Sequence, residues 1–168
     1  GSNVQTLISR SPLGVVRSDS DFTTALRFVE ASPVRVIDDR YTLLAGKKLD
    51  NRSRARERTF SFRNPTGAIL QVIVRAMDDG VAFRYCFPDA TGQETLILGE
   101  TTGFRFSSAG TAWLLPYDKV GIWTPSYEGI WRQVPLGATA PSDSAGWSFP
   151  ALFHTQDSWV LLTEAGMD

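Results

Sequence analysis

The sequence is poor in cysteine, in histidine and in net charge. Its 168 residues include one cysteine, Cys86, and one histidine, His154. A single cysteine excludes the small disulfide-stapled class of protein, and a single histidine excludes a histidine-rich zinc site. Lys and Arg number 17 against 18 Asp and Glu, which leaves a formal net charge of -1. No overall field attracts a polyanion, so we expect no nucleic-acid partner.

Long apolar runs are also missing. No stretch approaches the roughly 18 consecutive apolar residues of a membrane-spanning helix, so we expect no membrane insertion. No charged-then-apolar signal peptide opens the chain. The hydrophobic content of 42% is nevertheless enough for a chain of this length to bury a core, and we expect one domain over residues 1–168.

What the sequence does contain is short runs rich in Val, Ile, Phe, Tyr and Thr, separated by Gly, Pro, Asn and Asp. This pattern predicts an all-β fold, and its regular spacing favours a β-sandwich over any α/β fold. The segment from Leu136 to Gly146 is predicted to be one long surface loop. The runs expected to be strands are 59–63, 68–76, 81–87, 94–98, 102–106, 112–115, 129–134 and 159–163.

The first three runs predict a meander. A turn signal at Asn64-Pro65-Thr66-Gly67 separates the first two runs, and Asp78-Asp79-Gly80 separates the second from the third. In the third run alternate residues share a face, so Arg84 should lie opposite the aromatic side chains. The residues predicted to point into the core are Val81, Phe83, Tyr85 and Phe87.

One segment, from Asp21 to Glu30, fits two patterns. Phe22, Leu26 and Val29 have helical spacing, with Asp21 as a possible cap. Leu26 and Phe28, with the later Val34 and Val36, also fit two strands with a break at Ser32-Pro33. We favour strands, because tertiary context usually overrides a short local signal in a β-rich chain.

Arginine recurs at every second residue from Arg52 to Arg58, so in a strand all four guanidinium groups project from one face. Such a face could bind an anion or an acidic polysaccharide. A solvated outer strand is the favoured interpretation, since charge runs are most often simply exposed.

Five tryptophans are many for this length, and indole rings serve either a sandwich core or stacking on a sugar ring. Trp123 and Trp147 lie beside Pro- or Gly-rich loop sequence, which makes them weak candidates for substrate binding. Trp113 and Trp159 have strand-like apolar neighbours and are predicted to be core.

The sequence offers no convincing catalytic group. A nucleophilic triad needs a histidine held by an acid and a nucleophile elbow, and no Gly-x-Ser-x-Gly accompanies His154. A glycosidase needs two carboxylates that flank the scissile bond. The glutamates are scattered, and their spacing singles out no such pair. We therefore expect no catalytic residue in this chain.

Several blocks of sequence nevertheless resemble the amino-terminal domain of glycoside hydrolase family 97, over nearly the whole chain. The most specific block is Asp79-Gly80-Val81-Ala82-Phe83-Arg84-Tyr85. The others, in order, are Ser11-Pro12-Leu13-Gly14, Tyr41 with Gly46-Lys47, Glu100-Thr101-Thr102-Gly103-Phe104, Tyr127-Glu128 and Leu162-Thr163-Glu164-Ala165.

The resemblance implies a supersandwich similar to galactose mutarotase-like domains, preceding a catalytic (β/α)8 barrel that this chain lacks. It implies part of an exo-acting bacterial α-glucosidase or α-galactosidase, periplasmic or secreted, whose oligosaccharide substrate binds through the barrel. It also implies that Glu164 is a calcium ligand in the full-length enzyme. With one such carboxylate, we expect this chain to hold no calcium and to be inactive alone. The alternative is a free-standing carbohydrate-binding β-sandwich without catalysis.

Overall fold

The computed structural model describes residues 5–88, 94–123 and 128–165. Within these ranges all the regular secondary-structure elements are β-strands. The described residues therefore include no helix long and apolar enough to cross a membrane. The chain divides into two compact units, Pro12–Gly103 and Gly1–Ser11 with Phe104–Asp168. The predicted all-β sandwich class is confirmed. The expectation of one domain over 1–168 stays a prediction.

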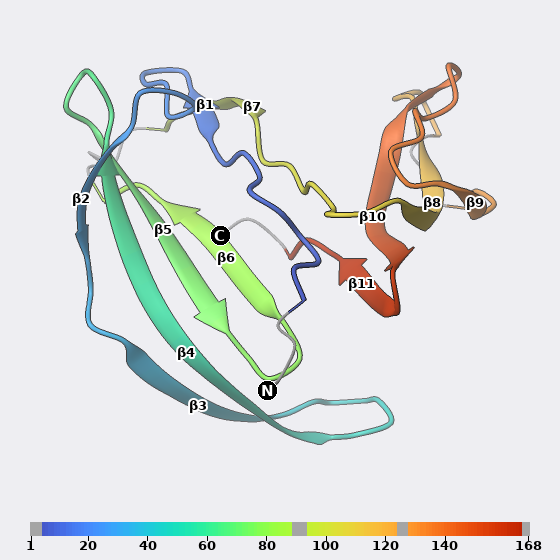
Figure 1. The fold of residues 1–168 in the computed structure, drawn as a ribbon, viewed down its shortest axis with the longest axis horizontal. Helices are drawn as coiled ribbons and strands as arrows, with labels where there is room; N and C mark the ends of the chain where they lie inside the picture. Colours follow the sequence, from blue (N-terminus) through green and yellow to red (C-terminus); the bar gives the residue numbers. More distant parts are fainter. Residues whose placement is uncertain (1–4, 89–93, 124–127, 166–168) are drawn as a thin grey trace. The chain divides into compact units, whose positions relative to one another are not determined.

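The Pro12–Gly103 unit is built on a five-stranded antiparallel sheet (Figure 1). Strand β4 pairs with β5 along one side. Along its other side β4 pairs with β2 near one end and with β3 near the other. The strands are β2 (Arg27–Ala31), β3 (Arg35–Thr42), β4 (Asp50–Arg63), β5 (Ile69–Ala76) and β6 (Val81–Cys86).

The two predicted turns of the meander are confirmed, and each has a local cause. The Asn64 side chain accepts hydrogen bonds from the backbone amides of Thr66 and Ala68, as asparagine does in a tight turn. At the second turn the amide of Met77 donates to the carbonyl of Gly80 over 2.8 Å. Strands β4, β5 and β6 follow one another as neighbours, as the sequence predicts.

The strand interpretation of the segment after Asp21 is also confirmed. Strand β2 ends at Ala31, and β3 begins at Arg35. Between them Ser32 keeps contact with β4, because its amide donates to the carbonyl of Thr59 and its hydroxyl accepts from the Thr59 amide. The proline that follows has no amide to donate, which explains why pairing is interrupted there.

The core of this unit lies on one face of the sheet. Its buried members are Phe22, Leu70 and Val72. Phe83, Tyr85 and Phe87 pack against them, as predicted, while Arg84 is exposed. The prediction for Val81 is wrong, since 70% of this residue is exposed. Val81 begins its strand and pairs with Ala76 at the end of β5, beyond the reach of the core.

A second, two-stranded sheet covers this core. It consists of β1 (Val15–Arg17) and β7 (Ile97–Glu100), which run antiparallel. Val15 is buried, and the guanidinium of Arg17 lies 4.6 Å from the ring centroid of Phe87. Two sheets with side chains between them give this unit its sandwich layering.

The other unit contains one four-stranded antiparallel sheet, in the order β11-β10-β8-β9. Ala112, Leu114 and Ala151 are buried on one face, and Val134, Trp147 and Phe153 pack against them. The ring of Phe106 also contacts Phe153, with 4.6 Å between centroids. The strands are β8 (Gly110–Asp118), β9 (Arg132–Pro135), β10 (Ser144–Thr155) and β11 (Ser158–Leu162).

Two predictions for this part of the chain are wrong. The run 102–106 forms no strand apart from a single bridge at Phe106, and its backbone instead bonds to the segment before β1, as in the hydrogen bond from Gly103 to Pro12. The predicted loop from Leu136 to Gly146 is shorter than expected, because β10 already begins at Ser144.

Candidate functional site

Three of the blocks that carry the family resemblance meet at the hydroxyl of Tyr85. This oxygen accepts a hydrogen bond from the backbone amide of Gly14 over 3.0 Å, and it lies 2.5 Å from Oγ1 of Thr102. The amide of Thr101 in turn donates to the carbonyl of Gly14. Burial raises the pKa of Tyr85, so its hydroxyl stays protonated. Three distant blocks are thus joined at one half-buried phenol.

Position 14 requires glycine, because the surrounding backbone leaves no room for a Cβ atom. A Cβ atom at this position would lie 2.8 Å from the carbonyl oxygen of Phe22 and 2.8 Å from Cα of Thr23. Both are backbone atoms that cannot move aside, and the φ angle of 154° is rare for residues with a side chain. The Ser-Pro-Leu-Gly block is therefore a close-packing element of the fold.

The arginines of β4 lie on one exposed face, as predicted. Arg52 forms an ion pair with Asp38, and Arg54 lies 3.7 Å from the same carboxylate. The hydrogen bond from Arg52 lowers the pKa of Asp38 to about 2. Arg58 donates to the carbonyl of Ser32 over 2.8 Å. Three of the four arginines thus have partners within the sheet, which supports the solvated-strand interpretation.

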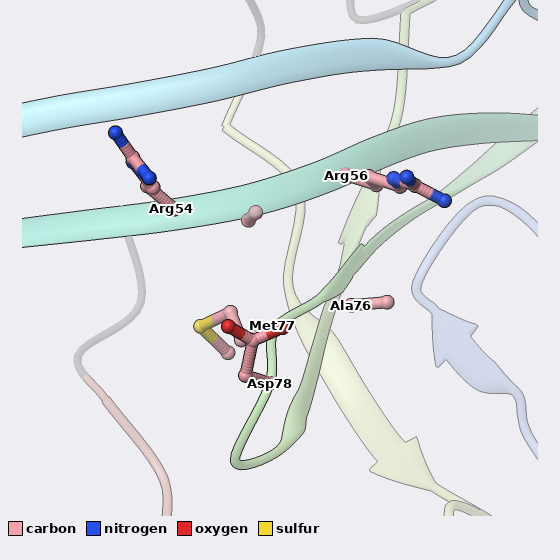
Figure 2. A pocket seen from close by; sticks show the side chains of 6 residues that line it. Arg54, Arg56, Ala76, Met77 and Asp78 are labelled. Carbon is pink, nitrogen blue, oxygen red and sulfur yellow. The ribbon is translucent and has the colours of Figure 1, made fainter.

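An open cleft of about 360 Å³ lies beside two of these arginines. Figure 2 shows Arg54 and Arg56 leaving β4 in different directions, with Met77 and Asp78 at the turn that follows β5. Because the two guanidinium groups point in different directions, they do not form a two-sided binding site for one anion. The cleft is lined by Arg54, Ala55, Arg56, Ala76, Met77 and Asp78.

The opposite face of β4 holds a buried carboxylate, Glu57. Arg35 on β3 and Arg75 on β5 each donate to it over 2.6 Å, one to each oxygen. These two hydrogen bonds, that of Arg75 first, lower the pKa of Glu57. Each carboxylate oxygen of Glu57 accepts a hydrogen bond from an arginine, so this side chain stabilises the pairing of the three strands. We therefore assign Glu57 a structural role and no role as a catalytic acid or base.

The tryptophans are distributed differently from the prediction. Trp123 is 88% exposed, as expected. Trp147 is not: it packs against the core of its unit, and its indole donates to the carbonyl of Ala138 over 2.9 Å. Trp159, predicted to be core, is 58% exposed and contacts the half-buried Trp113. Val160 lies on the opposite, half-buried face of the strand, whereas Trp159 shares the exposed face with Leu161.

Glu164 is exposed, two residues beyond the end of β11. The described residues contain no group of three or more His, Cys, Asp or Glu side chains that could hold a metal ion. Calcium takes six to eight oxygen ligands, so the single carboxylate of Glu164 would supply only one or two of them. Glu164 is suited to a calcium site in which most of the ligands come from another part of the full-length protein.

A family model described as "Glycosyl-hydrolase 97 N-terminal" matches residues 2–168. This match covers every block that meets at Tyr85. The chain belongs to glycoside hydrolase family 97. Within the family, its sequence corresponds to the amino-terminal domain.

A curated family-97 relative is named "Probable retaining alpha-galactosidase", from Streptomyces bingchenggensis (strain BCW-1). It is 34% identical over 163 residues, which is 97% of this chain and 24% of that protein. The chain thus spans about a quarter of its relative's length.

Solved structures agree with this assignment. A family-97 enzyme from Pseudoalteromonas sp. strain K8 has been solved in complex with acarbose, and a variant of it in complex with panose. Each matches this chain with a TM-score of 0.70 and 25% identity, over 90% of this chain and 22% of the other.

Two features of the family-97 chain escaped sequence reasoning. The junction at Tyr85 depends on contacts between residues 71 positions apart, which no local pattern reveals. The exposed contact between Trp113 and Trp159 depends on strand order. The sequence did offer one signal for it, since both tryptophans lie in predicted strand runs, where the register decides which face a side chain occupies.

Proposed function

We propose that this chain is the amino-terminal β-sandwich of an exo-acting α-glycosidase, packing beside a catalytic barrel elsewhere in the polypeptide. The observation that carries the proposal is the family match over residues 2–168. The relatives it matches are about four times longer, which leaves room for a barrel. One relative is named an α-galactosidase and another was solved with panose, so the proposed substrates are α-linked oligosaccharides.

We also propose that Glu164 completes a calcium site of the full-length enzyme. Its side chain is exposed and lies after the last residue of β11, so its carboxylate can contact a neighbouring domain. Calcium is a hard cation that prefers carboxylate oxygens, and one ligand from each domain would fix the two domains together. Calcium would supply a fixed positive charge near the substrate. Glu164 would hold that charge in place.

The experiment is a Glu164→Gln substitution in the full-length enzyme, followed by calcium titration with both metal affinity and hydrolysis of a nitrophenyl α-glycoside as readouts. Loss of a charged ligand should weaken calcium binding by about tenfold or more. Glu94→Gln, at another exposed glutamate, is the matched control and should leave both readouts unchanged. Equal calcium affinity in wild type and the Glu164 variant would rule out the ligand role.

Export to the periplasm or medium is the location we propose, following the family resemblance. Fractionation of the native host, with an antibody against this chain, tests it directly. Recovery in the cytoplasmic fraction alone would contradict the proposal.

A further inference from the structure

Three aromatic side chains are in contact on the four-stranded sheet. The indoles of Trp113 and Trp159 have centroids 5.0 Å apart, with 37° between their planes. The imidazole of His154 lies 4.5 Å from the Trp159 ring, with 38° between their planes. They come from three adjacent strands, β8, β10 and β11. We call them the aromatic face.

Strand register places this face opposite the core. Trp113 pairs with Leu152, and His154 pairs with Trp159. Directly paired residues share a face, and so do residues two apart in one strand, which puts all three aromatic rings on the same side. Their neighbours in sequence, Ala112 and Phe153, belong to the core cluster and lie on the other side.

The two indoles lie over the middle strand. Trp113 and Trp159 stand on β8 and β11, which are separated by β10. Strands two positions apart are roughly 9.6 Å from each other, because neighbours are about 4.8 Å apart. Centroids only 5.0 Å apart therefore require at least one of the two rings to lean inward across β10. The rings are tilted against one another, and Trp159 is 58% exposed, so part of the cluster is open to solvent.

A surface of this kind suits a pyranose ring. The face of an indole is negatively polarised and attracts the C–H groups on the apolar side of a sugar, whose hydroxyl groups point outward to the edge. Polar partners for such hydroxyls lie beside the rings. Gln133 is exposed and pairs with Trp113, and Thr111 pairs with His154. The face combines aromatic rings with an amide and a hydroxyl at its margin. It is therefore better suited to binding a saccharide than to binding an aliphatic surface of another protein.

We propose that the aromatic face of Trp113, His154 and Trp159 is a saccharide-binding site, which stacks on one pyranose ring of an α-linked gluco- or galacto-oligosaccharide. The choice of sugar rests on the proposed function. The stacking rests only on the geometry of the face.

The experiment follows the five indole N–H resonances of the 15N-labelled 168-residue chain by NMR. Panose is added in one series and methyl α-galactoside in another, which separates glucosyl from galactosyl recognition. We expect saturable shifts of the Trp113 and Trp159 resonances, with a dissociation constant of about 1 mM, typical of a small contact. Shifts in neither series would refute the proposal without bearing on hydrolysis by the full-length enzyme.

Matched variants locate the site. Trp159→Ala and Trp113→Ala should each weaken binding by about tenfold or more, the equivalent of about 1.4 kcal/mol. Trp123→Ala removes an indole that is 88% exposed but lies outside the aromatic face, and should change affinity by less than about twofold. Equal loss in the Trp123 variant would overturn the assignment. His154→Phe keeps a ring on the face, so binding should persist in it even where an alanine variant folds poorly.

Discussion

The phenol of Tyr85 and the backbone amide of Gly14 form a hydrogen bond of 3.0 Å between residues 71 positions apart. The same phenol oxygen lies 2.5 Å from Oγ1 of Thr102. Tyr85 also packs against the core of Phe22, Leu70 and Val72. One side chain therefore contributes both to the core and to the connection between the two sheets of its unit.

Tyr85→Phe should keep the packing and remove the phenol oxygen, which leaves the Gly14 amide without its acceptor. A partly buried donor that loses its partner costs about 1 to 3 kcal/mol. Urea denaturation at neutral pH measures the loss. Tyr41→Phe is the control, because Tyr41 is 52% exposed, and it should be close to neutral.

Gly14→Ala should destabilise the chain by about 2 to 4 kcal/mol, as overpacking and backbone strain usually do. The added methyl group would lie 2.8 Å from two backbone atoms. Gly80→Ala provides the comparison, since nothing lies within 4 Å of a methyl group there. Thermal unfolding of both variants is the measurement. Equal melting temperatures for the two would contradict the close packing at Gly14.

Glu57→Gln should destabilise the five-stranded sheet at neutral pH by about 1 to 3 kcal/mol, because charge-assisted hydrogen bonds to Arg35 and Arg75 are weakened. The side chain of Glu57 is 10% exposed, while those of Arg35 and Arg75 are 68% and 41% exposed, so water screens part of the effect.

The pH dependence of this variant has a definite sign. The pKa of Glu57 is lowered in the folded chain. Its contribution to stability is therefore complete above the ordinary glutamate pKa of about 4.3 and is lost as pH falls through the lowered folded value. Urea denaturation of wild type and variant between pH 7 and the acid range should show their difference shrinking. A difference that grows toward acid would contradict this account.

Phe83→Ala should cost about 2 to 4 kcal/mol, somewhat below the range for a fully buried phenylalanine, because Phe83 is only partly buried. Val81→Ala on the same strand face should be near neutral, since 70% of Val81 is exposed. Denaturant midpoints of the two variants check this. The reverse order would show that the core ends elsewhere along β6.

The 168-residue chain alone should not hydrolyse nitrophenyl α-glucoside or α-galactoside. Glycoside hydrolysis needs a pair of carboxylates, one on each side of the scissile bond. Glu57, the most buried glutamate, already accepts hydrogen bonds from two arginines. A chromogenic assay with the purified chain is the measurement. Turnover that scales with protein concentration and survives repurification would refute it.

The elements predicted correctly are those with local causes. The meander of β4 to β6 follows from the Asn64 and Asp78-Asp79-Gly80 turns and from strict alternation. Strand β10 is absent from the predicted runs because Ser144 and Gly146 are typical loop residues, and pairing with β8 places them in a strand. The run 102–106 has strand composition, but its backbone finds partners in the segment before β1 instead.

Burial was the least predictable property of the candidate site. Trp147 and Trp159 each lie in a strand, and their exposure depends on which face of the sheet is covered. Sequence alone could not decide this, because the residues that pack beside Trp147 come from β8, β9 and β10 together. The alternation of β4 was easier, since four arginines can share a face only if that face meets water.

The pairing of β1 with β7 has a consequence for the order of folding. Val15 pairs with Glu100, and this contact closes a long stretch of chain that includes the whole five-stranded sheet. Such closure loses more chain entropy than the short turns of the meander, so β1 and β7 should dock after β4, β5 and β6 have formed. The same strands should then be the first to open in the native state, and amide hydrogens of Val16 and Gly99 should exchange with solvent sooner than those of β5.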